Sequence, residues 1–246
     1  MASIELDHVS LAYPVYGMNS RSFKTSLVNL AIGGRLNKEG SILKVEAIKN
    51  IHLKLKSGDR LGLIGHNGAG KTTLLKVMAQ IYEPTQGKVT ISGQSHCLFD
   101  IMLGMDSELT GYENIMLRGL ILGFSKREME KSIPEIEEFS ELGEFLKMPI
   151  KSYSSGMLIR LAFGIITTIP SEILLIDEVV SAGDARFMEK AKARMASLIH
   201  QSDIMVLSTH DHQAIREFCN QALWLEQGEI KFFGEIGECE WIRRTL

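Results

Sequence analysis

The sequence has few cysteines, and the three it has are far apart. Cys97, Cys219 and Cys239 are the whole complement of the 246 residues. Their separations match no metal-ligand spacing, so a zinc site built on cysteine is not expected. Isolated thiols of this kind are typical of a reducing compartment, and they predict a cytosolic protein with reduced cysteines.

Long apolar runs and long basic runs are also absent. The longest apolar stretch, residues 158–169, is interrupted by Arg160 and is shorter than the roughly 18 residues of a membrane-spanning helix. The first residues, MASIELDHVS, lack the basic and apolar regions of a signal peptide. With a formal charge of −3, the chain is expected to be soluble by itself and to have no nucleic-acid partner. A membrane-bound partner is not excluded.

What the chain does have is an alternation of strand-like and helix-like patterns. Its length and its hydrophobic fraction of 45% fit one large α/β domain, or such a domain with an added lobe. Apolar alternation and short buried runs predict strands at 4–11, 42–55, 61–64, 88–91, 173–178, 204–207, 222–225 and 230–233. Helical periodicity predicts helices at 20–32, 74–81, 113–122, 126–142, 158–166 and 184–201.

The strongest motif lies between a predicted strand and a predicted helix, and it reads Gly65-His66-Asn67-Gly68-Ala69-Gly70-Lys71-Thr72-Thr73. Its glycines let successive backbone N–H groups point at an anion, and the start of the helix adds a positive field. Lys71 supplies a cation, and the Thr72 hydroxyl is a ligand type for Mg²⁺. A glycine-rich turn without function is disfavoured because the full motif has the required context. The motif therefore predicts a phosphate-binding loop.

Polar residues end two other predicted strands. Asp177 and Glu178 end the strand that begins at 173, and His210 follows the strand at 204–207. In a doubly wound sheet, ligands gather at the carboxyl ends of strands. Since a phosphate-binding loop is also present, we expect Asp177 to hold Mg²⁺ and Glu178 to orient and deprotonate water. His210 is a candidate for contact with a γ-phosphate; the alternative is a structural histidine, which is the usual role of a lone histidine.

The first strand and the segment after it carry two further features. Tyr13, preferred to Tyr16, is a candidate for stacking on a nucleotide base; the alternative is an ordinary half-buried tyrosine. Residues 20–32 predict a short amphipathic helix with basic character. Such a helix would lie against a membrane-embedded partner or the headgroup layer, or it would pack on its own domain, and the pattern favours neither.

Residues 99–152 are predicted to be a helical insertion. A methionine-containing loop at 99–105 comes first. Two capping-box patterns follow, Thr110 with Glu113 and Ser125 with Glu128, and each predicts a helix start.

A serine- and glycine-rich segment then opens a strongly apolar helix; it reads Tyr153-Ser154-Ser155-Gly156-Met157. A helix N-terminus of this kind is a second place to hold an anion. Taken alone, a capped core helix is the simpler interpretation.

In this order the motifs resemble those of the ATP-binding subunit of ABC transporters, over essentially the whole chain. Residues 65–73 resemble Walker A, 173–178 resemble Walker B with its catalytic glutamate, 181–184 resemble the D-loop, and His210 resembles the switch histidine. The resemblance implies an α/β fold of the ABC-type P-loop ATPase class, with a mixed-sheet core, an N-terminal antiparallel β subdomain and an inserted helical lobe. It divides the chain into core residues 1–98, a lobe with the signature motif at 99–168, and core residues 169–246.

The resemblance also implies roles for individual residues. Glu178, His210 and Lys71 would be catalytic. The residues that would bind ATP are Tyr13, Gly65, His66, Asn67, Gly68, Ala69, Gly70, Lys71, Thr72, Thr73, Ser154, Ser155 and Gly156. Mg²⁺ would be held by Thr72 and Asp177, with Asp100 in place of a glutamine that the general family has after Cys97 and this chain lacks.

The signature position points to one subgroup. The general family has LSGGQ there, whereas this chain reads YSSGM at 153–157, followed by Arg160-Leu161-Ala162-Phe163. Three features resemble those of the subunits that export O-antigen, capsule and teichoic acid. They are the YSSGM text, the long segment between Tyr13 and Val45, and the Leu103-Gly104 loop. Some O-antigen exporters add a C-terminal carbohydrate-binding domain, for which we expect no room before Leu246. That favours an exporter that does not read a terminal sugar cap, or a capsule-type system.

The resemblance implies an ATPase that drives export of a lipid-linked polysaccharide, O-antigen first and capsule or teichoic acid as alternatives. ATP and Mg²⁺ would be its cofactors. Its partners would be integral-membrane permease subunits and a second copy of the chain, whose Ser154 and Gly156 close over the γ-phosphate in a head-to-tail dimer. It would lie peripherally on the cytoplasmic face of the inner membrane.

Two other function classes compete with transport. An ATP-driven clamp on DNA or ribosomes would show long coiled-coil insertions, paired ATPase domains or a basic face, and the sequence has none of these. A small-molecule P-loop kinase would need neither YSSGM, nor His210, nor a helical lobe. Within transport, import and drug or lipid efflux are the remaining alternatives. No residue pattern identifies the glycan.

Overall fold

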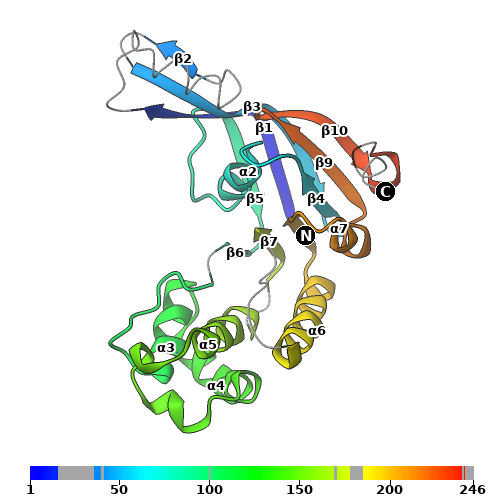
Figure 1. The fold of residues 1–246 in the computed structure, drawn as a ribbon. Coiled ribbons are helices and arrows are strands. Elements are labelled where there is room, and N and C mark those ends of the chain that lie inside the picture. Colours follow the sequence, from blue (N-terminus) through cyan, green and yellow to red (C-terminus); the bar gives the residue numbers. More distant parts are fainter. Residues whose placement is uncertain are drawn as a thin grey trace. The chain divides into compact units, whose positions relative to one another are not determined.

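A computed structural model describes residues 1–15, 36–39, 42–99, 101–168, 171–177, 185–239 and 241 (Figure 1). The chain forms two compact units. Unit 1 comprises Met1–Cys97, Glu172–Glu178 and Asp203–Leu246, and unit 2 comprises Leu98–Ser171 and Val179–Ser202. The sequence-based division assigns 169–246 to the core, whereas the packing groups 179–202 with the unit that contains the helical lobe.

Unit 1 is built on two sheets (Figure 1). Sheet A is antiparallel and has the order β2-β3-β1-β5, with β1 at Ser3–Val15, β2 at Leu36–Glu39, β3 at Ile42–Lys56 and β5 at Gln86–Ser92. Sheet B has the order β10-β9-β4-β8-β7-β6, with β4 at Arg60–Ile64, β6 at Ser95–Leu98, β7 at Ile173–Asp177, β8 at Ile204–Ser208, β9 at Gln221–Glu226 and β10 at Glu229–Glu235. The predicted mixed α/β fold with an antiparallel β subdomain is confirmed.

The strands at the centre of sheet B are parallel, which explains their composition. Strand β8 pairs in parallel with both β4 and β7, and β4 also pairs in parallel with β9. All five residues of β8 are buried, as are four of the five in β4 and in β7. Strands covered on both faces read as continuous apolar runs. The closing hairpin predicted at 222–233 is the antiparallel pair β9 and β10.

Helix α2 (Lys71–Met78) contacts strands of both sheets, namely β3, β5, β7 and β8. Its apolar face is buried at Leu74, Leu75 and Met78, as predicted. The extension of this face to Ile81 is wrong, because the helix ends at Met78 and the Ile81 side chain is 54% exposed. Gln80 has a φ of 57°, which turns the chain out of the helix before Ile81.

Unit 2 is helical. Its elements are α3 (Gly111–Ile121), α4 (Lys126–Ser140), the short 3₁₀ helices Gly143–Lys147 and Ile150–Ser152, α5 (Ser155–Thr168) and α6 (Ala185–Gln201). Both predicted capping boxes form, each with the reciprocal pair of hydrogen bonds at the start of α3 and of α4. A core of its own holds the unit together; its buried residues are Ile115, Met129, Ile136, Leu142, Leu146, Ile150, Tyr153, Leu161 and Ile165.

Some elements were not predicted, and some predictions have no counterpart in the described residues. The missed elements are β2, β6, α7 (His212–Phe218) and the 3₁₀ helices, of which the last is Ile236–Glu238. Helix α7 follows a good N-cap signal, since the Asp211 carboxylate accepts hydrogen bonds from Gln213 N and Ala214 N. The predicted helix at 20–32 and Tyr16 lie outside the described residues.

All three cysteines and the apolar helix α5 lie in the described part of the chain. Cys97, Cys219 and Cys239 are free thiols. Burial raises the pKa of both Cys97 and Cys219 to about 12, so these thiols are protonated near neutral pH. Among the described residues, no helix combines the length and the apolar character needed to cross a bilayer.

Candidate nucleotide-binding site

The predicted phosphate-binding loop lies between β4 and α2. Its backbone takes conformations that only glycine adopts readily, with φ of 149° at Gly65, 75° at Gly68 and 111° at Gly70. A Cβ atom at Gly65 would lie 2.3 Å from the Leu225 carbonyl oxygen, and one at Gly70 would lie 2.6 Å from that of Ala47. Two of the three glycines are therefore required by contact as well as by dihedral angle.

Lys71 is held inside this loop. Its ammonium Nζ donates hydrogen bonds to the carbonyl oxygens of Gly65, at 2.7 Å, and His66, at 3.3 Å. The residue is only 8% exposed, although it carries a charge. The N-cap residue of α2 is Gly70, which provides no side-chain cap, so the helix N-terminus is open to another acceptor. A fixed cation and a helix N-terminus thus lie together at the end of β4.

The remaining loop residues face outward or brace the turn. His66, Asn67 and Gly68 are exposed, as is Thr72, whereas Ala69 is buried and accepts a backbone hydrogen bond through its carbonyl oxygen. Outward-facing residues at the tip of such a loop are accessible to a bound molecule.

The closing hairpin supports the loop, a role that the sequence did not predict. Gly228, in the turn between β9 and β10, donates its N–H to the carbonyl oxygen of Ala69 at 2.9 Å. Its own carbonyl oxygen accepts from Lys49 N at 2.8 Å, which also ties the turn to β3. Gly228 has a φ of 83°, and a Cβ there would lie 2.7 Å from the Ala47 carbonyl oxygen. Only the pairing of β9 with β4, which no local pattern reveals, brings this turn to the loop.

The sheet brings the predicted metal ligand and the predicted histidine to the edge where the loop lies. Asp177 is the last residue of β7 and pairs with Ser208, the last residue of β8. Ser208 pairs in turn with Leu63 of β4, two residues before Gly65. His210, two residues beyond β8, is exposed. The loop, His210 and Asp177 therefore follow the carboxyl ends of three adjacent parallel strands, where ligands bind in sheets of this kind.

Glu178 and the predicted D-loop at 181–184 lie outside the described residues, and so does Asp100. Their predicted roles rest on sequence.

Tyr13 lies near the loop, at the end of the first strand. Its ring contacts the Tyr82 ring edge-on, with centroids 5.8 Å apart. Partial burial raises the pKa of Tyr13, and a hydrogen bond with Thr73 acts in the opposite direction. Because Thr73 is the last residue of the motif, the structure brings Tyr13 to the start of α2. Base stacking by Tyr13 stays a prediction.

One aromatic contact of the loop was missed. The Trp241 ring lies edge-on to the His66 ring at 5.9 Å and is 5.1 Å from the His212 ring. Trp241 thus lies next to the loop, and no spacing in the sequence connects positions 66 and 241.

The signature segment opens α5 in unit 2. The Ser154 hydroxyl accepts a hydrogen bond from Met157 N at 3.3 Å, so the helix is capped, as the simpler interpretation requires. Ser154 and Ser155 are nonetheless exposed, and Gly156 is half-buried. A Cβ on Gly156 would meet only the Ser154 hydroxyl, at 3.9 Å, so the helix N-terminus is open in front of these residues. The segment can both cap its helix and present donors to another molecule.

These residues fit a nucleoside triphosphate and Mg²⁺. A Cβ would collide with backbone at two of the loop glycines, and Lys71 is already buried with its charge inside the loop. The Thr72 hydroxyl and the Asp177 carboxylate are oxygen ligands of the kind that Mg²⁺ prefers. When bound, Mg²⁺ would neutralise charge on the phosphate oxygens.

Comparison with known proteins agrees with this geometry. A family profile described as ABC transporter matches residues 48–181, from the middle of β3 to beyond β7. The O-antigen export system ATP-binding protein RfbE of Yersinia enterocolitica is 47% identical over 231 residues, which cover 94% of this chain and 97% of RfbE. The chain is an ATP-binding subunit of the ABC transporter family.

Other relatives of this ABC ATP-binding subunit are longer. RfbB of Myxococcus xanthus, an O-antigen export system ATP-binding protein, is 38% identical over 88% of the chain, which spans about half of RfbB (49%). The teichoic acids export ATP-binding protein TagH of Shouchella clausii is 40% identical over 78% of the chain, which again spans about half of that protein (53%).

Solved structures place the fold in the same class. An ATP-binding subunit of an ABC transporter superposes with a TM-score of 0.70 at 21% identity, covering 98% of this chain and 92% of the other. The ATP-binding cassette MJ0796, in a dimeric post-hydrolysis state bound to ADP and Pi, superposes with a TM-score of 0.68 at 21% identity, covering 95% and 98%. As a member of this family, the subunit is an ATPase.

Proposed function

We propose that this ABC ATP-binding subunit drives export of a lipid-linked polysaccharide, with O-antigen as the cargo. The observation that carries the proposal is the 47% identity with the O-antigen export protein RfbE, which extends over 97% of that protein's length. Teichoic acid export is the second candidate, because TagH proteins match at 35–40% identity. A capsule exporter is a third member of the same class.

The proposed catalytic cycle uses the residues at the end of sheet B. ATP binds with its phosphates at the loop amides and at Lys71, whose charge stabilises the transition state. Glu178 orients and deprotonates the attacking water, and His210 contacts the γ-phosphate. Ser154, Ser155 and Gly156 of a second copy close over that phosphate in a head-to-tail dimer. The open N-terminus of α5 supports this step, because exposed hydroxyls there are accessible to a ligand held by another molecule.

We further propose that the lobe docks on an integral-membrane permease subunit at the cytoplasmic face of the inner membrane. Three of its large apolar side chains are exposed in one region, Leu103 at 70%, Leu120 at 56% and Ile121 at 59%. The loop that carries Leu103 lies beside α3, since a Cβ on Gly104 would lie 2.9 Å from the Ile121 side chain. Exposed apolar groups of this kind mark interaction surfaces in soluble proteins.

The test is an export assay in cells that depend on this subunit. Glu178→Gln and a deletion of the chain are compared with the wild type, and surface and cytoplasmic polysaccharide are quantified separately. Lys76→Ala, at the end of α2, is the control for a substitution near the site. Loss of surface glycan with accumulation inside both mutant strains is expected. The structure of the accumulated glycan distinguishes O-antigen from capsule and teichoic acid, and normal surface glycan in both strains would remove the polysaccharide assignment.

A further inference from the structure

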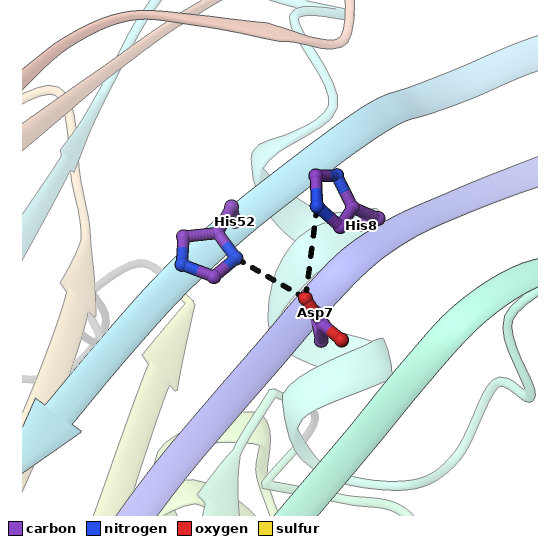
Figure 2. Close-up of side chains that lie close together, drawn as sticks. All are labelled: Asp7, His8 and His52. Carbon is purple, nitrogen blue, oxygen red and sulfur yellow. Dashed lines mark ion pairs between the residues drawn. The ribbon is translucent and has the colours of Figure 1, made fainter.

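Three potential metal ligands lie close together on sheet A, and none of them belongs to the phosphate-binding loop (Figure 2). They are Asp7 and His8 on β1 and His52 on β3, all exposed. His52 Nδ1 lies 3.4 Å from Asp7 Oδ1, and His8 Nε2 lies 3.8 Å from the same oxygen. One ligand atom from each residue lies within 4.8 Å of the other two. This is the one group of three such residues among those the structure describes.

A β-bulge creates this arrangement. Leu6 pairs with Leu53 and Val9 pairs with Ile51, so two residues of β1, Asp7 and His8, face the single residue His52 of β3. In a regular strand, neighbouring side chains point to opposite faces, and His8 would then turn away from Asp7. Both side chains instead lie on the side of His52 (Figure 2).

The bulge has an energetic cost, which the burial of both Leu6 and Val9 on the core side offsets in part. His8 has a φ of 49°, in the left-handed region that side chains rarely adopt, and its side chain is 69% exposed. A strained residue buried in a core could be held there by its contacts, but an exposed histidine gains little from packing. Strain that persists on an exposed, chemically active side chain is typical of ligand-binding positions.

A second residue orients the His8 ring. His8 Nδ1 lies 2.7 Å from the side-chain oxygen Oδ1 of Asn50. Because an amide oxygen only accepts, Nδ1 carries the proton, and the neutral ring then has its lone pair on Nε2. Nε2 is the atom that faces Asp7. Histidines that bind metals usually donate their other N–H in this way, which fixes both the tautomer and the ring orientation.

The distances and the ligand types select a class of ion. Two ligands about 2.0–2.1 Å from one ion at the tetrahedral angle lie roughly 3.3 Å apart. The contact of His52 with Asp7 has this spacing at 3.4 Å, that of His8 with Asp7 is longer at 3.8 Å, and the two histidine ligand atoms lie within 4.8 Å of each other. Two imidazoles and one carboxylate suit zinc and its neighbours in the first transition row, whereas Mg²⁺ and Ca²⁺ prefer oxygen alone.

We propose that Asp7, His8 and His52 form a site for a divalent transition-metal ion of the zinc type, with solvent or a further ligand completing the coordination. Asn50 is a positioning residue for His8. A bound ion would join β1 to β3 across the bulge and so stabilise sheet A. The nearby Lys54 ammonium is paired with Glu5 at 2.6 Å, so part of its charge is balanced next to the site.

The experiment uses the full chain, stripped of metal and then kept in excess Mg²⁺ so that oxygen-ligand sites are filled. Zn²⁺ affinity and stoichiometry are measured by competition with a chromogenic chelator, and Co²⁺ absorption reports nitrogen ligation. The variants are Asp7→Asn, His8→Asn and His52→Asn. Asparagine at position 8 tolerates the positive φ, so the bulge is retained. His200→Asn, which removes an exposed histidine from α6, is the matched control.

The expected result is one Zn²⁺ per wild-type chain and at least a tenfold loss of affinity in each of the three variants. Asn50→Gly, which also tolerates its φ of 47°, should weaken Zn²⁺ binding roughly tenfold and abolish the preference of His8 for the Nδ1–H tautomer in ¹⁵N spectra. Zn²⁺ should raise the unfolding temperature of the wild type and of His200→Asn, but not of His52→Asn. Equal Zn²⁺ affinity in the wild type, in His52→Asn and in Asp7→Asn, with all three folded, would overturn the proposal.

Discussion

Lys71 in unit 1 and Arg118 in unit 2 are both buried cations that bind main-chain carbonyl oxygens of a neighbouring loop. Lys71 donates to Gly65 and His66, and Arg118 Nη1 donates to Ile101 and Leu103. They are 8% and 3% exposed. The two loops themselves differ. Glycine dihedral angles, the β4 strand and the hairpin turn fix the loop around Lys71, whereas the loop bound by Arg118 carries the exposed Leu103.

This difference between the two loops indicates that the charge of Lys71 is needed for chemistry, whereas the charge of Arg118 is needed for structure. The loop at Lys71 would keep its path without the ammonium, because backbone contacts on both sides determine it. In the described part of the loop at Arg118, a turn bond runs from Met105 N to Met102 O at 3.2 Å, and Arg118 itself binds the carbonyl oxygens of Ile101 and Leu103. We therefore expect substitution of Lys71 to affect ATP hydrolysis most, and substitution of Arg118 to affect stability and docking most.

The largest effect is expected for Lys71→Ala. Removing a fixed cation from the phosphates should lower kcat for ATP hydrolysis by roughly 100- to 1,000-fold, as for other preorganised donors that act on transition-state charge. Steady-state phosphate release measures this, and urea unfolding of the same sample should show a much smaller change. Lys76→Ala, on the same helix, should retain activity within about twofold. If Lys71→Ala unfolded at a much lower urea concentration than the wild type but hydrolysed ATP normally when folded, Lys71 would have a structural role and not a catalytic one.

Gly228→Ala tests the brace behind that loop. The left-handed φ costs about 1–2 kcal/mol for any residue with a Cβ, and the collision with the Ala47 carbonyl oxygen adds about 1 kcal/mol or more. Gly58→Ala is the matched control, because Gly58 has a φ of 96° in unit 1 but nothing within 4 Å of the added Cβ. Urea unfolding should therefore show a greater loss for Gly228→Ala, together with weaker ATP binding. Equal losses in the two variants would show that the hairpin turn does not support the loop.

Lys71 and Gly228 also differ in how far the sequence alone could predict their place in the structure. The position of the loop between a strand and a helix could be predicted because such a motif has fixed residue types at fixed local spacing, and the common edge of Asp177 and His210 because parallel strands end together. The roles of these residues stay predictions. The support from Gly228 was not predictable, since it depends on which strand pairs with β4 at a distance of more than 150 residues. The error at Ile81 has a local cause, because a single positive φ at Gln80 ended a pattern that was otherwise helical.

The same limit applies to the exposed cluster on sheet A. Asp7 and His8 are adjacent in sequence, but regular strand alternation would separate them, and His52 is 44 positions from His8. Only the bulge between Leu6 and Val9 brings the three side chains together. Irregularities of this kind depend on tertiary packing, and apolar periodicity does not reveal them.

Arg118→Met is expected to have the next largest effect. The apolar stem is retained while the charge-assisted hydrogen bonds to Ile101 and Leu103 are lost. This should destabilise unit 2 by about 2 kcal/mol, because water can replace part of the lost bonding at this loop. ATP hydrolysis by the isolated subunit should change little, whereas export in cells should fall. Arg127→Met, an exposed position on α4, is the control for loss of charge. Loss of isolated ATPase activity equal to that of Lys71→Ala would show that the two cations do not differ in role.

The smallest effect concerns the capping box of α3, where the charge is exposed and the expected pH dependence follows from a pKa. The Thr110 N–H and hydroxyl each donate to Glu113 Oε2 at 2.8 Å, and the backbone bond, followed by the side-chain bond, lowers the pKa of Glu113. A group whose pKa is lower in the folded state stabilises that state above its unfolded pKa, about 4.3, and loses the contribution as pH falls through the folded value.

Glu113→Gln should therefore be less stable than the wild type at pH 7, and the difference should shrink below about pH 4. Urea unfolding at both pH values measures it, with Glu130→Gln on the surface of α4 as the control. If Glu113→Gln were destabilised by the same amount at both pH values, the charge of Glu113 would not contribute to the cap. The start of α3 would then depend on neutral hydrogen bonds and backbone conformation, as the loop at Lys71 does.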